Sequence, residues 1–64
     1  MPIQELLTVL RDKDTVYLEL NNKAGYIDTH YIGVSEIKLI QKYLTAKVDS
    51  ISVFKGKLYI KVHL

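Results

Sequence analysis

The sequence predicts a small α+β domain in the order helix, strand, strand, helix, strand, strand, with a four-stranded antiparallel or mixed sheet and two helices on one face. Apolar residues recur every three or four positions near residues 3–10 and 37–44, which is typical of amphipathic helices. Segments near residues 15–20, 26–32 and 48–63 alternate apolar and polar side chains, as half-buried strands do. The 64 residues and the lack of Cys predict a single domain, residues 1–64, without disulfides.

The first predicted helix begins close to the amino terminus. Ile3, Leu6, Leu7 and Leu10 are spaced i, i+3, i+4 and i+7, so they share one face of a helix. Pro2 suits the start of a helix, because the N–H that proline lacks would have no helical partner there. This helix should therefore place its leucines on the sheet.

The first hairpin follows directly. In "TVYLEL", residues 15–20, the apolar positions alternate with Tyr17 and Glu19, which predicts a strand with one buried face. "NNKAG" has the Asn and Gly residues that turns favour. In "YIDTHYI", residues 26–32, we expect Ile27 and Tyr31 to point inward, which turns Tyr26, Asp28, His30 and Ile32 outward. The apolar Ile32 on that side leaves the opposite assignment open.

The second predicted helix lies in "GVSEIKLIQKYLTAK", residues 33–47. Ser35 is expected to cap its first turn, and Val34 to pack on Leu39 as a hydrophobic staple. Its expected buried face covers about half of the helix circumference. That face consists of Ile37, Leu39, Ile40, Tyr43 and Leu44.

The last hairpin reads "VFKGKLYIKVHL", residues 53–64. A two-residue turn at Lys55-Gly56 pairs Phe54 with Lys57 and Val53 with Leu58, which keeps apolar and polar side chains on separate faces. Lys is not the preferred first residue of such a turn, so a bulged turn is the alternative. The expected buried face holds Val53, Leu58, Ile60 and Val62. Two hairpins that meet at a parallel central pair would form one sheet, and one such layout is a circularly permuted ferredoxin-like sandwich. The strand order stays open.

Two helices on one face leave the other face of the sheet open. The expected partner-binding residues on that face are Tyr17, Tyr26, Phe54, Lys57, Tyr59 and Lys61. Aromatic side chains dominate protein interfaces, so one interpretation is a face that binds a host protein or a second copy of the chain. The second is single-stranded nucleic-acid binding, in which rings stack on bases and lysines neutralise phosphates. The third is structural, because cross-strand aromatic pairs stabilise sheets.

The net charge of +2 is unevenly distributed along the chain. Residues 1–32 carry three basic and five acidic side chains, whereas residues 33–64 carry six and two. On the expected open face the first hairpin would be acidic, with Glu19 and Asp28, and the second basic. This charge split favours a protein partner, since acidic side chains would repel nucleic-acid phosphates.

No motif in the sequence predicts catalysis, so we expect a protein that is not an enzyme and needs neither a cofactor nor a small-molecule substrate. His30 and His63, with Asp28 nearby, lack the spacing of a metal site. "MPIQELL" resembles no signal peptide, and no apolar run reaches the roughly 20 residues of a membrane span. We expect a cytoplasmic protein without a membrane partner.

Residues 3–20, "IQELLTVLRDKDTVYLEL", combine a short helix, a Lys-Asp turn and an immediate strand. This pattern resembles the opening of small early proteins of phages of Gram-positive bacteria, including anti-CRISPR proteins that inhibit Cas9. The matching positions are Ile3, Leu6, Leu7, Leu10, Arg11, Lys13, Asp14, Val16 and Leu18. The resemblance implies a compact phage or mobile-element protein that inhibits or modulates a host protein, such as a CRISPR nuclease, by binding to it.

Overall fold

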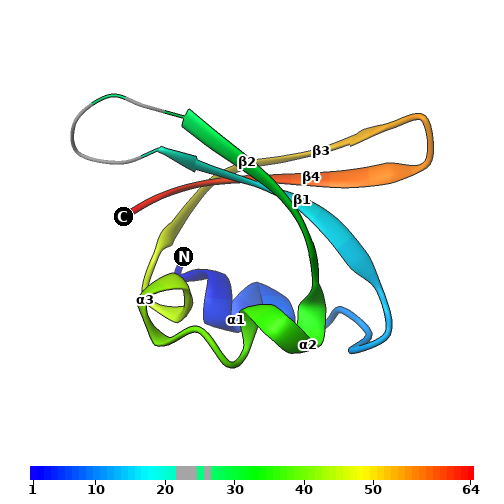
Figure 1. Cartoon of the computed structure of the whole chain (residues 1–64), viewed down its shortest axis with the longest axis horizontal. Coiled ribbons are helices and arrows are strands. Elements are labelled where there is room, and N and C mark those ends of the chain that lie inside the picture. Colours follow the sequence, from blue (N-terminus) through cyan, green and yellow to red (C-terminus); the bar gives the residue numbers. More distant parts are fainter. Residues whose placement is uncertain (22–24, 26) are drawn as a thin grey trace.

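The computed structural model describes residues 1–21, 25 and 27–64, which form a four-stranded sheet with three short helices beneath one face (Figure 1). The elements in chain order are α1 Ile3–Leu7, β1 Thr15–Asn21, β2 Ile27–Gly33, α2 Val34–Ile37, α3 Gln41–Leu44, β3 Lys47–Phe54 and β4 Lys57–His63. The predicted α+β class is confirmed. Tyr26 and most of the first predicted turn lie outside the described residues.

The sheet joins two antiparallel hairpins at a parallel central pair. Its strand order is β2-β1-β4-β3, and β1 runs parallel to β4 from the pair Tyr17 and Tyr59 to the pair Asn21 and His63. Of the antiparallel and mixed sheets that the sequence left open, the structure therefore has the mixed one. Because β1 and β4 each have a neighbour on both sides, they form the inner part of the sheet, and β2 and β3 form its edges.

The hydrophobic core lies between the central strands and the helices. Leu18 and Ile60, which pair across β1 and β4, have no exposed surface, and neither does Val62. From the helix layer, Ile3 and Ile37 are equally buried. The remaining core residues are Leu6, Leu7, Val16, Leu20, Val34 and Ala46. The predicted apolar stripe of the first helix thus does face the sheet.

The second predicted helix is divided into α2 and α3, and this part of the prediction is wrong. Ile40 has an extended backbone (φ −105°, ψ 98°), so the chain bends between the two helical turns. The bend leaves Leu39 85% exposed, which rules out its packing on Val34. The amino-terminal cap is Gly33, without a side-chain hydrogen bond, so Ser35 does not cap the helix. The bend lets α2 contact β2 while α3 contacts α1, and this packing outweighs the helical pattern.

The faces of β2 are the reverse of those predicted. Tyr17 pairs with Tyr31 and Leu18 with His30, and residues that pair across a sheet point to the same side. Tyr31 and Ile27 therefore lie on the open face, whereas Asp28 and His30 lie on the helix side. The half-buried Ile32 packs against the core in the place predicted for Tyr31. A shift of one residue reverses every side chain of a strand.

The β3–β4 hairpin has the predicted register, with Phe54 opposite Lys57 and Val53 opposite Leu58. The burial predicted for the apolar face of this hairpin is only partly correct. Ile60 and Val62 are buried and Leu58 is half-buried, but Val53 is 70% exposed. The reason is visible in Figure 1, where the turn of this hairpin extends beyond the end of the helix layer.

The turn of this hairpin offers a direct stability test. Lys55 (φ 52°) and Gly56 (φ 75°) both have left-handed backbones, as a type I′ turn requires. Lys55 Nζ also lies 5.4 Å from the centroid of the Phe54 ring, a contact that asparagine would lose. Asn tolerates the left-handed conformation better than Lys, so Lys55→Asn should still raise the free energy of unfolding by about 0.5 kcal/mol. Urea denaturation measures the gain. Lys13→Asn, at an exposed residue without positive φ, should have no effect, and an equal gain there would contradict the explanation.

Candidate binding face

Four aromatic side chains, one from each strand, cross the open face of the sheet. In strand order they are Tyr31, Tyr17, Tyr59 and Phe54, and we call them the aromatic row. Neighbouring ring centroids lie 4.7 Å apart between Tyr31 and Tyr17, 4.6 Å between Tyr17 and Tyr59, and 6.5 Å between Tyr59 and Phe54. Because the register of both hairpins and of the central pair fixes these positions, the row is a product of the whole sheet.

The two central rings stack on each other. The planes of Tyr17 and Tyr59 differ by 8°, and their centroid distance matches the spacing of about 4.8 Å between neighbouring strands. Rings that lay flat on the sheet would overlap at this distance, so the two rings stand on the sheet with their faces toward each other. Tyr31 covers the other side of Tyr17. The two faces of the Tyr17 ring are therefore covered, one by Tyr59 and the other by Tyr31.

The ends of the aromatic row are the exposed part. Tyr31 is 56% exposed and Phe54 is 60% exposed, whereas Tyr17 and Tyr59 are half-buried. The central pair thus resembles the cross-strand aromatic pairs that stabilise sheets. The outer pair offers apolar surface that nothing in the described chain covers.

Lysines dominate the charge around the row. Lys57 Nζ lies 5.6 Å from the centroid of the Tyr31 ring, and Lys61 is in register with Glu19 on the neighbouring strand. Of the acidic residues expected on this face, Glu19 is there, but Asp28 lies on the helix side. The predicted division into an acidic and a basic hairpin is therefore wrong.

A β-bulge marks the other end of the face. The register of β3 shifts between Val48 and Ser50, and the His63 Nδ1 atom lies 2.6 Å from the Asp49 Oδ1 atom. This contact joins the end of β4 to the bulge. Within the described part of the chain, no three His, Asp or Glu side chains are grouped so that they could hold a metal ion.

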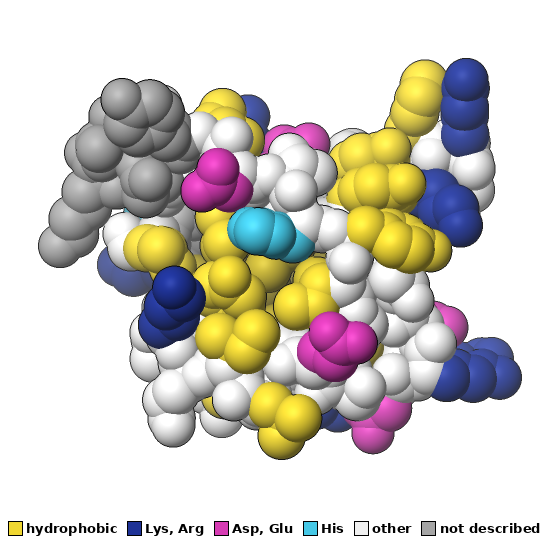
Figure 2. All heavy atoms as spheres, in the orientation of Figure 1, with side chains coloured by type: hydrophobic (Ala, Val, Ile, Leu, Met, Phe, Trp, Pro, Cys, Tyr) yellow, Lys and Arg dark blue, Asp and Glu magenta, His cyan; other side chains and the backbone are white. Residues whose placement is uncertain are grey.

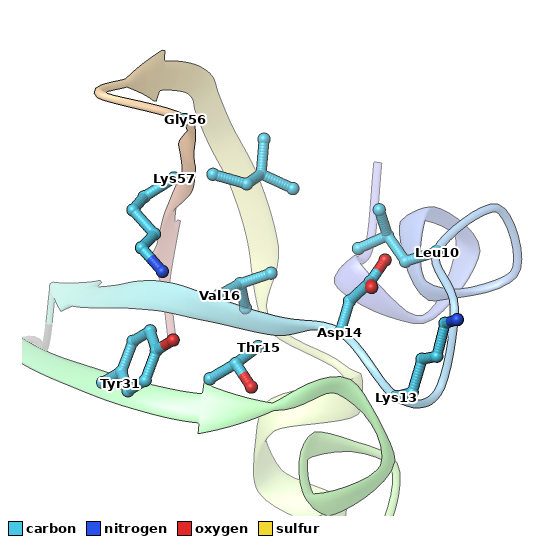
Figure 3. Close-up of a pocket in the computed structure, with 9 residues that line it drawn as sticks. Leu10, Lys13, Asp14, Thr15, Val16, Tyr31, Gly56 and Lys57 are labelled. Carbon is cyan, nitrogen blue, oxygen red and sulfur yellow. The ribbon is translucent and has the colours of Figure 1, made fainter.

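A cleft of about 380 Å³ adjoins the aromatic row where β1 and β4 separate (Figure 3). The parallel pairing begins at Tyr17 and Tyr59, so the strand segments before these residues diverge. Figure 3 shows Lys57 and Tyr31 pointing toward each other across it. The lining also includes Leu10, Lys13, Asp14, Thr15, Val16, Gly56 and Leu58. The cleft lies beside Tyr31 and is lined both by residues of the open face and by Leu10, Val16 and Leu58 from the helix side.

The structure brings most of the predicted site residues together on one face. Tyr17, Phe54, Lys57, Tyr59 and Lys61 share the open face, as predicted. Sequence reasoning missed Tyr31, which it had placed in the core. The available signal was Ile32, the next residue, which fits the core position better than a tyrosine with a polar hydroxyl.

The fold and the site define a small α+β domain that displays an aromatic row on a sheet face that no described helix or strand covers. Comparison with protein-family models, with curated proteins and with solved structures found no match for the chain. Among the described residues, no helix is long and apolar enough to span a membrane.

Proposed function

We propose that this protein is a non-enzymatic protein-binding module and that its contact surface is the aromatic row. The exposed rings of Tyr31 and Phe54 at the two ends of the row carry this proposal. Tyrosine and phenylalanine supply large contact areas at low entropic cost, and aromatic residues dominate the binding energy of many interfaces. The cleft beside Tyr31 would receive a projecting side chain of the partner.

The charges of the open face indicate the kind of partner. Lys57 and Lys61 flank the row, and of the two acidic side chains that were expected to balance them only Glu19 is on this face, opposite Lys61. A complementary partner therefore presents an acidic surface with an apolar centre. The phage resemblance of residues 3–20 makes a cytoplasmic host protein, such as a CRISPR nuclease, the partner that we propose.

Single-stranded nucleic acid is the alternative partner, and the same two lysines favour it. The geometry of the rings weighs against it, because bases bind to sheet proteins by stacking on exposed ring faces. In the aromatic row, Tyr17 and Tyr59 already cover each other. A protein, which can contact ring edges and hydroxyl groups, fits this arrangement better than a base does.

The double substitution Tyr31→Ala with Phe54→Ala tests the proposal. Both side chains are exposed, so the far-UV circular dichroism spectrum should stay unchanged while affinity for the partner falls at least about a hundredfold, as for paired hot-spot residues. The tagged protein would be incubated with lysate of the source cells, with and without nuclease. Bound proteins would be quantified by mass spectrometry, and the affinity of the captured protein measured after its purification.

Leu39→Ala is the matched control, because it removes an apolar side chain that is 85% exposed on the helix side. This variant should capture the same protein as the wild type. Capture that survives the double substitution would show that the aromatic row is not the contact surface. Capture that is lost after nuclease treatment, together with oligonucleotide affinity that falls steeply with salt, would establish the nucleic-acid alternative instead.

A further inference from the structure

The outer edge of β3 is open for pairing over its second half. Its first half is covered by the amino-terminal segment, since Val48 N–H donates to the Met1 carbonyl at 2.8 Å and Ile3 N–H donates to the Ala46 carbonyl at 2.8 Å. Pro2 forms the corresponding bridge with Lys47. No described segment pairs with the outer edge of residues 50–54, although these residues belong to a regular strand.

The open part of this edge is apolar and uncharged. Ile51 is 46% exposed, Val53 is 70% exposed and Phe54 is 60% exposed, and the other two residues of the segment 50–54 are serines. Figure 2 shows hydrophobic side chains gathered with lysine or arginine side chains where the β3–β4 hairpin projects. Long apolar edges are the ones that pair with other strands, and proteins ordinarily block them with charges, prolines or covering segments.

The opposite edge of the sheet has such a block. On β2 the helix-side positions include Asp28 and His30, both exposed. Polar and charged side chains that point inward from an edge strand oppose pairing with another strand, because pairing would bring them beside an apolar strip. The two edges of the sheet therefore differ. The exposed apolar residues of β2, Ile27 and Tyr31, lie on the open face, whereas Ile51 and Val53 of β3 expose apolar side chains on the helix side, where β2 carries Asp28 and His30.

We propose that two copies of this chain associate through antiparallel pairing of their β3 strands, with the two-fold axis at Ser52. In this register Ile51 of one copy lies opposite Val53 of the other, and the reverse pair forms on the far side of the axis. All four side chains point to the helix side, so they form a continuous apolar strip. The result is one eight-stranded sheet, and the proposal is independent of what the aromatic row binds.

The backbone geometry of the hairpin supports this register. The residues that flank a two-residue turn form a hydrogen-bonded pair, and such pairs alternate with non-bonded ones along an antiparallel ladder. Counting from Phe54, the N–H and C=O groups of Val53 and Ile51 therefore point away from β4 toward the open edge. When Ile51 of one copy pairs with Val53 of the other, the outward N–H and C=O groups of both residues form hydrogen bonds. Ser52 then lies opposite Ser52 of the second copy in a non-bonded pair.

The charges at the margins of the pairing are also complementary. The register places Asp49, which already contacts His63, beside Lys55 of the second copy. A two-fold axis repeats this pair at the other end of the interface. A register shifted by two residues toward the turn would instead set Val53 against itself and Ile51 against Lys55, which places a lysine on the apolar strip.

Sedimentation velocity over a hundredfold range of protein concentration tests for the dimer, because self-association depends on concentration. The wild type should shift from monomer to dimer across this range. Val53→Lys places a charge on the exposed apolar strip and should raise the dimer dissociation constant at least about tenfold. Ile27→Lys, at an exposed position of the β2 edge, is the matched control and should leave association unchanged.

The double variant Ile51→Glu with Val53→Lys tests the register. In the proposed pairing each new glutamate faces a new lysine of the other copy, so dimerisation should recover relative to Val53→Lys alone. Failure to recover dimerisation in the double variant, with an unchanged far-UV spectrum, would overturn the register.

A cysteine scan completes the test, since the chain has no Cys of its own. Ser52→Cys places two thiols across the axis in a non-bonded pair, where Cα atoms are about 4.5 Å apart and a disulfide can form. Ser50→Cys, two residues from the axis, is the control and should not cross-link. Equal cross-linking of both variants, or a wild type that is monomeric at every concentration, would overturn the proposal. So would a dimer that survives Val53→Lys but not Tyr31→Ala, because it would be sealed by the open face.

Discussion

Replacing Leu18 by Ala should lower the free energy of unfolding by about 2–5 kcal/mol, the range for buried leucines. Leu18 has no exposed surface, lies on a central strand and pairs with the equally buried Ile60, so no neighbour can close the cavity without moving the sheet. At about 0.05–0.15 kcal/mol per residue, a chain of this length has only about 3–10 kcal/mol of stability. The variant should therefore be marginally folded or unfolded at 25 °C.

Leu39→Ala is the control for this prediction. It makes the same chemical change at a side chain that is 85% exposed, so it should alter stability by less than about 0.5 kcal/mol. Urea denaturation followed by circular dichroism measures both variants. Had the second helix been continuous, as its sequence pattern predicts, Leu39 would be a core residue. A large loss of stability in Leu39→Ala would therefore contradict the bend between α2 and α3.

Replacing Tyr17 by Leu should lower the free energy of unfolding by about 1–3 kcal/mol, because the centroid of the Tyr17 ring lies 4.7 Å from that of Tyr31 and 4.6 Å from that of Tyr59. Each aromatic pair contributes about 0.5–1.5 kcal/mol beyond the area that it buries. Leucine keeps an apolar side chain on the strand, so the loss reports mainly on the ring contacts. Urea denaturation of the single variants and of the pair Tyr17→Leu with Tyr59→Leu forms a double-mutant cycle.

The coupling energy between Tyr17 and Tyr59 should fall within that range, since their rings are stacked at 4.6 Å. Tyr31 and Tyr59 lie on either side of Tyr17 and provide the control cycle, in which the coupling should be below about 0.5 kcal/mol. Coupling energies of similar size in both cycles would show that the row does not stabilise the sheet through contacts between neighbouring rings. Stabilisation by the central rings is compatible with binding by the outer ones, because different side chains carry the two roles.

Local patterns predicted the elements that depend on neighbouring residues. The leucine stripe of α1 and the alternation of β1 correctly identified Leu6, Leu7 and Leu18 as core residues. The turn at Lys55-Gly56 fixed the register of the last hairpin, because a two-residue turn leaves a single pairing. The same register correctly placed Lys57, Tyr59 and Lys61 on one face.

Predictions failed where the packing or pairing of one element with another decided the structure. The side chains of β2 alternate between two faces, but their pattern does not say which face is inward. The register of β2 with β1 decides this and places Tyr31 beside Tyr17. Helical periodicity from Ile37 to Leu44 is genuine, but the chain bends at Ile40 so that α2 and α3 pack against different elements. In both cases the deciding contacts join residues that are distant in sequence.

The sequence by itself determined the α+β class, the two hairpins and the set of residues from which the core and the open face are drawn. The tertiary structure alone decided the strand order, the phase of β2 and the extent of the helix layer. The physical reason is that periodicity assigns a residue to one side of its own element but does not say what covers that side. The helices end before the β3–β4 turn, so Val53, which has the pattern of a core residue, lies on an exposed edge.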